Sequence, residues 1–247
     1  TAAAVIQEAV EAVIQPGALV LVSNGVYGTG GKIMQAGLSN RVALNLPLTL
    51  RSVNGPAETF IVGSESNGHP AMRCVYVGSK SALIGFSLTN GYADWGGEVE
   101  REGAAGGAWC ESGGIISNCV FLGNTGGYGG GAYGGQIYNC RFVGNTARYK
   151  GGGVAESELY NCLMTGNTAE WSGGGAFGGK LYNCTITSNS AGQDGGGTSC
   201  EEIYNCIISG NSAIHNGGGT AGGVLHNCTL VGNAAGNEGG GSTGRLV

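Results

Sequence analysis

The sequence is poor in charged residues, in histidine and in long apolar runs. Charged residues make up 11% of its 247 residues, with a formal net charge of −5 at pH 7 and a pI near 5.2. A nucleic-acid-binding surface needs a basic stripe, which this composition does not supply. No apolar run reaches the roughly 18 residues that a membrane-spanning helix needs. We therefore expect neither nucleic-acid binding nor membrane insertion.

Glycine, in contrast, is abundant, with 53 residues. So much glycine usually indicates disorder, but hydrophobic residues here reach 41% and the glycines recur at regular positions. We therefore expect a single elongated domain over residues 1–247. No signal peptide is evident, so we expect the sequence to be a mature product or a piece cut from a longer one.

The glycines belong to an internal repeat. The stretch GGGAYGGQIYNCRFVGNTA returns as GGGVAESELYNCLMTGNTA and as GGGAFGGKLYNCTITSNSA. Copies begin at Gly129, Gly151, Gly173, Gly195 and Gly217, after a shorter relative at Gly106. One cysteine of each copy marks the period, with one step of 21 residues and then steps of 22: Cys119, Cys140, Cys162, Cys184, Cys206 and Cys228. A fixed period of this size indicates a stacked array.

The composition of each repeat favours β-structure. Short runs such as IYNCRFV alternate with glycine clusters and Gly-Asn or Ser-Asn turns, and the spaced leucines of a leucine-rich repeat are missing. Three strands of about four to five residues, joined by three turns, use about 22 residues. We therefore predict an all-β fold, a right-handed parallel β-helix of about nine coils. Residues 106–247 should form regular coils, 18–105 irregular first coils, and 1–15 an amphipathic helix that caps the first coil.

Equivalent residues of successive coils should stack in columns about 4.8 Å apart. The repeated cysteines should face the core as reduced thiols, because parallel Cβ vectors at that spacing lie beyond disulfide range. A straight column also lacks the tetrahedral geometry of a zinc site. An asparagine ladder should lie at a bend where the backbone is left-handed, a conformation that asparagine tolerates. It consists of Asn118, Asn139, Asn161, Asn183, Asn205 and Asn227.

These repeats resemble the right-handed parallel β-helix proteins of the pectate-lyase-like superfamily, above all the Gly-Gly-Gly and Asn-Cys rich repeat proteins of bacterial cell surfaces. The segments VIQEAVEAVIQPGALVLVSNGVY, LTLRSVNGPAETFIVG and ALIGFSLTNG are similar to that family's opening coils. The resemblance implies an extracellular or cell-surface location in a bacterium. It implies little about activity, since the superfamily includes lyases, hydrolases, adhesins and inert stalks.

Enzyme motifs of that superfamily are scarce here. The regular coils carry only isolated acids, and the Asp-Asp and Gly-His-Gly signatures of its hydrolases are absent. Three histidines, His69, His215 and His226, provide no triad. We therefore predict no catalytic residue. If the protein is nevertheless an enzyme, a polysaccharide lyase or a glycoside hydrolase is expected.

Two stretches are candidate ligand sites. Three exposed residues precede each glycine triplet, and they should line one edge of the solenoid, the predicted edge: Tyr128, Tyr149, Trp171, Gln193, Asp194 and His215. Aromatic rings beside amides and carboxylates suit a sugar chain, although polar turns can also simply decorate a scaffold. The largest departure from the repeat, DWGGEVEREGAA, is a candidate Ca²⁺ site without EF-hand spacing, or a solvated loop: Asp94, Glu98, Glu100 and Glu102.

Taken as a whole, the sequence favours a non-catalytic extracellular β-helix that serves as a surface stalk, an adhesin or a filament subunit. The alternative is a carbohydrate-binding module, or a lyase-like enzyme acting on acidic glycans. Apart from Ca²⁺, no cofactor is expected. The last repeat stops at Val247, at the start of its next strand. We therefore expect the final coil to meet another subunit or a downstream segment, because an uncovered coil is a template for strand pairing.

Overall fold

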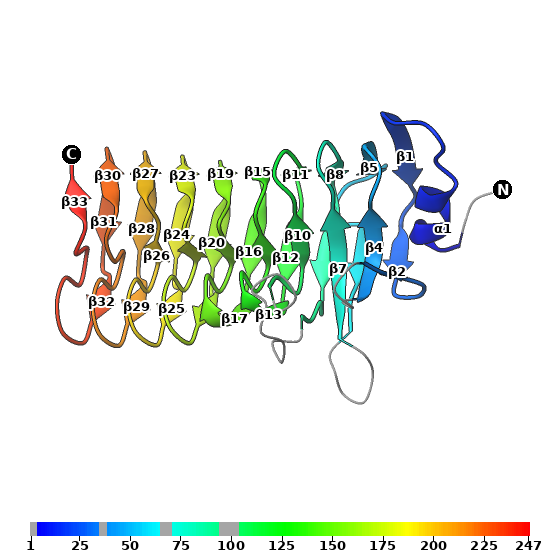
Figure 1. Ribbon diagram of the computed structural model, residues 1–247. Helices are drawn as coiled ribbons and strands as arrows, with labels where there is room; N and C mark the ends of the chain where they lie inside the picture. The colour runs from blue at the N-terminus through cyan, green and yellow to red at the C-terminus, as the bar shows by residue number, and fades with distance from the viewer. Residues whose placement is uncertain (1–3, 35–38, 65–70, 94–103) are drawn as a thin grey trace.

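The chain winds into a parallel β-helix whose coils stack along one axis, with the N-terminus at one end and the C-terminus at the other (Figure 1). The computed structural model describes residues 4–34, 39–64, 71–93 and 104–247. Among the strand pairs in these ranges, all are parallel except β3–β4. The fold predicted from the sequence is confirmed.

Four sheets run along the axis. The first, sheet A, holds ten described strands, close to the predicted nine coils: β1 Ala18–Val22, β5 Leu48–Ser52, β8 Ala82–Ile84, β11 Ile115–Ser117, β15 Gln136–Tyr138, β19 Glu158–Tyr160, β23 Lys180–Tyr182, β27 Glu202–Tyr204, β30 Val224–His226 and β33 Arg245–Leu246. Sheet B follows it in every coil: β2 Gly25–Tyr27, β6 Thr59–Val62, β9 Ser87–Thr89, β12 Val120–Leu122, β16 Arg141–Val143, β20 Leu163–Thr165, β24 Thr185–Thr187, β28 Ile207–Ser209 and β31 Thr229–Val231.

The other two sheets lie on either side of the glycine triplets. Sheet C begins in the irregular coils and then follows the glycine pair or triplet of the regular ones: β3 Lys32–Ile33, β4 Ser39–Leu44, β7 Met72–Val77, β10 Ala108–Cys110, β14 Ala132–Tyr133, β18 Val154–Ala155, β22 Ala176–Phe177 and β26 Thr198–Ser199. Sheet D comes before it: β13 Thr125–Tyr128, β17 Thr146–Lys150, β21 Thr168–Ala169, β25 Ser190–Ala191, β29 Ser212–Ala213 and β32 Ala234–Ala235. The prediction of three strands per coil is therefore wrong for the regular repeats. The NTA and NSA segments form a fourth strand, because their Thr or Ser and Ala residues pair in register from coil to coil.

The first coil is covered by a helix, α1 Ile6–Glu11, which is shorter than the predicted 1–15. Ile6 and Val10 are buried in the core. The Oε1 atom of buried Gln7 accepts a hydrogen bond of 2.7 Å from the backbone N–H of Ala43. The helix thus covers apolar side chains and satisfies a buried backbone donor, which is how a solenoid end is closed. Among the described residues, no helix has the length and apolarity needed to cross a membrane.

The core consists of stacked identical positions. The Phe121 and Phe142 rings stack with centroids 4.6 Å apart and continue into Met164, Ile186 and Ile208, all fully buried. The predicted cysteine column is buried and unbridged, except that Cys228 at its end is half-buried. Each asparagine of the predicted ladder has a left-handed backbone, with φ between 50° and 55°. The cysteines of this column thus lie in or at the edge of the core, and the asparagines lie at bends with a left-handed backbone.

A second asparagine ladder, inside the solenoid, was not predicted. It consists of Asn124, Asn145, Asn167, Asn189, Asn211 and Asn233, of which the first five are buried. Asn167 Oδ1 accepts hydrogen bonds from the N–H and the Nδ2 of Asn145, at 3.0 and 2.9 Å. Its own Nδ2 donates to Phe142 O at 3.0 Å and to Asn189 Oδ1 at 2.9 Å. The ladder thus satisfies the buried backbone polar groups of each turn, which cannot reach water.

Removing one rung of this inner ladder should destabilise the protein strongly. We expect Asn167→Ala to lower the free energy of unfolding by about 2–4 kcal/mol, because buried donors and acceptors on both adjacent coils lose partners. Urea unfolding followed by circular dichroism measures the loss. The control is Asn161→Gly in the exposed ladder, where glycine suits the φ of 55° and one 3.3 Å amide bond is lost. Equal losses in the two variants would contradict the role of the inner ladder.

The cysteines should react according to their burial. Burial raises the pKa of Cys74, Cys110 and Cys200 to about 12, so these thiols stay protonated and unreactive at neutral pH. We expect a maleimide to label Cys228 in the native protein and the other eight thiols only after denaturation. Mass spectrometry of the labelled peptides identifies the sites. Rapid native labelling of the whole ladder would refute the burial of this column.

Candidate functional site

Outward-facing side chains of sheet C form a column of rings. Successive residues of a strand alternate between faces, so the residue after each buried Ala132, Val154 or Ala176 points outward. The column reads Trp109, Tyr133, Ala155, Phe177 and Ser199, in continuous register. Trp109 and Tyr133 stack with centroids 4.6 Å apart, and Tyr133 and Phe177 are half-buried. The sheet therefore presents aromatic surface outward.

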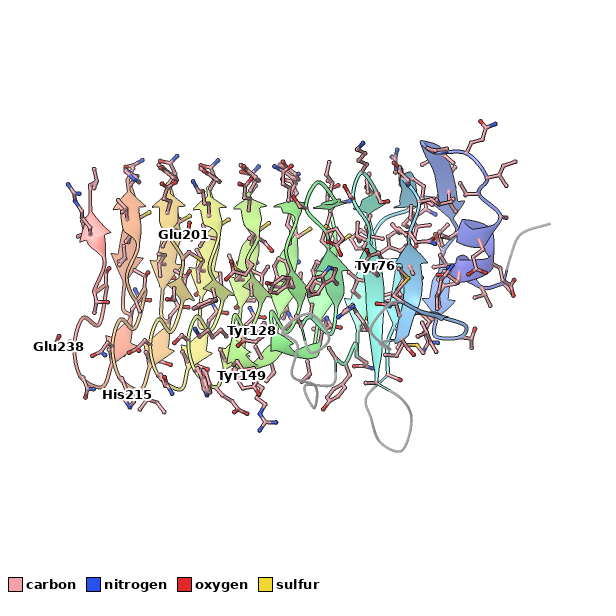
Figure 2. All side chains as sticks on the ribbon, viewed as in Figure 1. Tyr76, Tyr128, Tyr149, Glu201, His215 and Glu238 are labelled. Atoms are coloured by element: carbon pink, nitrogen blue, oxygen red, sulfur yellow. The ribbon has the colours of Figure 1, made fainter. Side chains whose placement is uncertain are left out.

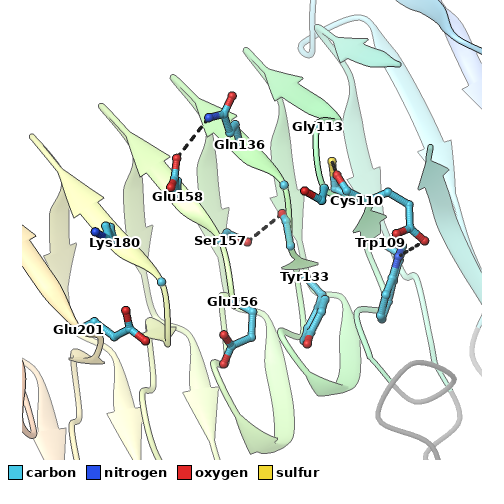
Figure 3. A pocket seen from close by; sticks show the side chains of 15 residues that line it. Trp109, Cys110, Gly113, Tyr133, Gln136, Glu156, Ser157, Glu158, Lys180 and Glu201 are labelled. Atoms are coloured by element: carbon cyan, nitrogen blue, oxygen red, sulfur yellow. Dashed lines mark hydrogen bonds between the residues drawn. The ribbon is translucent and has the colours of Figure 1, made fainter. Parts of the chain in front are cut away.

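A cavity of about 710 Å³ lies between this column and sheet A (Figure 3). Its aromatic wall is Trp109 and Tyr133, and its polar wall consists of Glu111, Gln136, Glu156, Ser157, Glu158, Lys180 and Glu201. A second cavity, of about 500 Å³, lies on the sheet D side of the column, and its lining includes Lys150, Ser172, Phe177, Asp194, Asn216 and Glu238. We call the two cavities together with the column the sheet C trough.

In the cavity beside sheet A, the carboxylates of Glu111 and Glu158 are held by hydrogen bonds. Glu111 Oε1 accepts from Trp109 Nε1 at 3.1 Å and from the Tyr76 hydroxyl at 3.2 Å. Glu158 Oε2 accepts from Gln136 Nε2 at 3.2 Å and from the Tyr160 hydroxyl at 3.3 Å. Figure 3 shows the bond to Trp109 and the bond between Gln136 and Glu158 as dashed lines. These acceptors are therefore oriented before any ligand arrives, as a binding site requires.

The trough is predominantly negative. It holds six carboxylates against two lysines, Lys150 and Lys180. Lys180 Nζ lies 2.9 Å from Glu202 Oε2, and this hydrogen bond raises the pKa of Lys180, so its ammonium stays charged at neutral pH. Lys150 Nζ lies 4.4 Å from the centroid of the Phe177 ring. Both cations thus already have partners, and the carboxylates set the charge of the site.

Glu156 has an unusual backbone for its residue type. Its φ is 54°, in the left-handed region, where the equivalent positions one coil away on either side are Gly134 and Gly178. A Cβ atom on Gly178 would lie 2.4 Å from Glu156 Oε1, so the carboxylate lies over this glycine. A non-glycine residue in this conformation costs on the order of 1 kcal/mol. Backbone strain of this kind concentrates at functional sites.

The structure brings together most residues of the predicted edge but not Asp194. Tyr149 lies between Tyr128 and Trp171, with ring centroids 5.3 and 5.0 Å away, and Figure 2 shows Tyr128, Tyr149 and His215 along the same side. Backbone hydrogen bonds continue the Tyr149 column through Trp171, Gln193 and His215. Asp194, however, belongs to the neighbouring column, where it accepts from Asn216 N–H and Nδ2 at 3.0 and 2.9 Å and lines the trough.

The candidate Ca²⁺ residues Asp94, Glu98, Glu100 and Glu102 lie outside the described residues, and their role stays a prediction. Among the residues that are described, no three His, Cys, Asp or Glu side chains come together as a metal site would require.

The trough itself was missed in the sequence, although a signal was present. Trp109, Tyr133 and Phe177 all fall two residues after a Gly-Gly pair at the start of a repeat. The glutamates that follow looked isolated, because they lie in different coils. Reading the two positions after the ring column down the repeats would have brought these residues together.

The fold has known counterparts among solved structures. A pectate lyase is 15% identical, with a TM-score of 0.51 over 89% of this chain, which spans 63% of that enzyme's length. An alginate lyase from a Paenibacillus species is 10% identical, with a TM-score of 0.50 over 96% of this chain and 95% of its own. The chain has the pectate-lyase-like parallel β-helix fold. No protein-family model and no curated protein matches the sequence of this β-helix.

The left-handed backbone of Glu156 leads to a prediction about the stability of the protein. We expect Glu156→Gly to leave the free energy of unfolding unchanged within about 0.5 kcal/mol or to raise it slightly, because relief of the left-handed strain offsets the added freedom of the unfolded chain. Thermal and urea unfolding test this. A loss of more than about 1 kcal/mol would instead mean that the Glu156 side chain stabilises the fold.

Proposed function

We propose that the protein binds an extended polysaccharide along the sheet C trough, outside the cell or at its surface. The observation that carries the proposal is the pair of cavities that flank the ring column, in which Tyr133 and Phe177 are half-buried. Ligand sites in proteins combine such apolar surface with a few oriented polar groups. The carboxylates of Glu111 and Glu158, fixed by their hydrogen bonds, are suitable acceptors for sugar hydroxyl groups.

The repeat distance of the solenoid also supports a chain ligand. Adjacent coils lie about 4.8 Å apart, which is close to the length of one sugar residue in an extended chain. Each coil along the trough then offers one subsite, and a long ligand gains contacts from several coils. Two of the structures with this fold are lyases named for the polysaccharides pectate and alginate, which agrees with this class of ligand.

This proposal favours the alternative of the sequence analysis over a purely structural stalk, adhesin or filament subunit. A structural coil does not need oriented acceptors beside rings in a cavity. The proposal concerns binding, and an enzyme is its extension: carboxylates on both sides of a bound sugar are the groups that glycosidases use. Association through the last coil, where Leu246 and Val247 are exposed, stays a separate prediction.

The proposed function is tested by ring removal in the trough. A glycan array first identifies a ligand, and isothermal titration calorimetry then compares variants. We expect Tyr133→Ala and Phe177→Ala each to weaken binding about tenfold, because each removes apolar contact surface that the sugar covers. Tyr182→Ala is the matched control, since this tyrosine lies in sheet A, where it stacks on Tyr160 outside the trough.

The predicted edge provides the competing result. If Trp171→Ala and Tyr149→Ala abolish binding while the two trough variants bind normally, the ligand lies at the edge and the trough proposal is wrong. If no glycan binds the wild-type protein, a structural role is favoured instead. Melting temperatures of all variants exclude misfolding as the cause.

A further inference from the structure

The trough alternates with a period of two coils. The two positions after the ring column are Cys110-Glu111, Gly134-Gly135, Glu156-Ser157, Gly178-Gly179, Cys200-Glu201 and Gly222-Gly223 in successive coils. A carboxylate therefore recurs in every second coil, and the coils between have a Gly-Gly pair with no side chain. Figure 3 shows Glu156 and Glu201 on the polar side of the cavity, two coils apart.

From Tyr133 to Ser199 the rings follow the same period in the opposite phase, whereas Trp109 lies in the coil that carries Glu111. Tyr133 precedes one Gly-Gly pair and Phe177 precedes the next. The carboxylate-bearing coils that follow each of them have a small residue in the ring column, Ala155 and Ser199. The repeating unit over these coils is thus a pair of coils. One has a ring followed by a Gly-Gly pair, and the next has a small residue followed by a carboxylate. Two coils span about 10 Å, which is the length of two sugar residues in an extended chain.

The chain's own ammonium groups indicate what the trough accepts. Lys150 Nζ lies over the Phe177 ring in the cavity that also contains Asp194 and Glu238. Lys180 Nζ, in the other cavity, bonds to Glu202. Six carboxylates remain against these two engaged cations, so an anionic polymer would meet like charge and an ammonium-bearing one would meet complementary charge.

We propose, building on the proposed function, that the ligand is an amino-sugar polysaccharide whose alternate residues face the same way, such as a β-1,4-linked glucosamine chain. In such a chain the ammonium groups on one side recur every second residue, which matches the recurrence of Glu111, Glu156 and Glu201. The faces of the sugars between them lie against Tyr133 and Phe177. Polyuronates are disfavoured at this site by like-charge repulsion.

The test compares three hexasaccharides by calorimetry at a pH where the amines are protonated: glucosamine, its N-acetylated form and galacturonate. We expect the glucosamine hexamer to bind most tightly, the neutral acetylated hexamer more weakly and the galacturonate hexamer not measurably. Glu156→Gln and Glu201→Gln should each weaken glucosamine binding threefold to fivefold, as expected for solvent-accessible ion pairs. They should leave binding of the acetylated hexamer within twofold. Added salt should reduce only the glucosamine affinity.

Glu170→Gln is the control, because it removes the same charge from an exposed residue of the same coil outside the trough. Equal affinity for the acetylated and free-amine hexamers, or tightest binding of galacturonate, would overturn this inference and leave polysaccharide binding intact. Binding of glucosamine that Glu170→Gln weakens as much as Glu156→Gln would also overturn it. If none of the hexamers binds, this inference fails, and the glycan array decides whether the proposed function fails with it.

Discussion

Parallel pairing of each coil with the next, in register, is the constraint on which the structure depends. It places every residue directly over its equivalent, as with Phe121 over Phe142 and Leu159 over Leu181. A residue type persists in a column only if it tolerates its own copy about 4.8 Å away. Aliphatic side chains, thiols, amides and aromatic rings do, and these are the columns of the core and of the sheet A face, where Tyr160 stacks on Tyr182 at 4.8 Å.

The inner asparagine ladder shows how this constraint resolves a polar problem. Each turn after sheet B has backbone groups inside the solenoid, and the amide of one coil bonds to the backbone and the amide of the next. The same pairing explains the middle glycine of the triplet. A Cβ on Gly174 would lie 2.3 Å from the carbonyl oxygens of both Gly196 and Ser190, which are themselves fixed by the stack. Glycine there lets the triplet pack directly against the backbone of the next coil.

Columns that face solvent can change chemical character from coil to coil, whereas the core column from Phe121 to Ile208 changes only among apolar side chains. The ring column and the two positions after it change from coil to coil, while the cysteine and asparagine columns remain constant. On the surface of sheet A, Lys180 and Glu202 of neighbouring coils form an ion pair at 2.9 Å. Function in such a molecule is therefore a pattern along the axis, read across coils, and not a local motif.

The sequence alone determined the fold, the core columns, the buried thiols and the bends at Asn139 and its equivalents, because a 22-residue period leaves few ways to stack short strands. It did not determine sheet D, the separation of Asp194 from Gln193 into different columns, or the trough. Those depend on where each turn bends and on which side chains then share a surface. Glu156 illustrates the reason: its φ of 54° turns it over Gly178 and beside rings from other coils. The spacing of hydrophobic residues in the sequence indicates which residues of one coil are buried. Only the stacked structure brings together residues whose positions differ by multiples of the period.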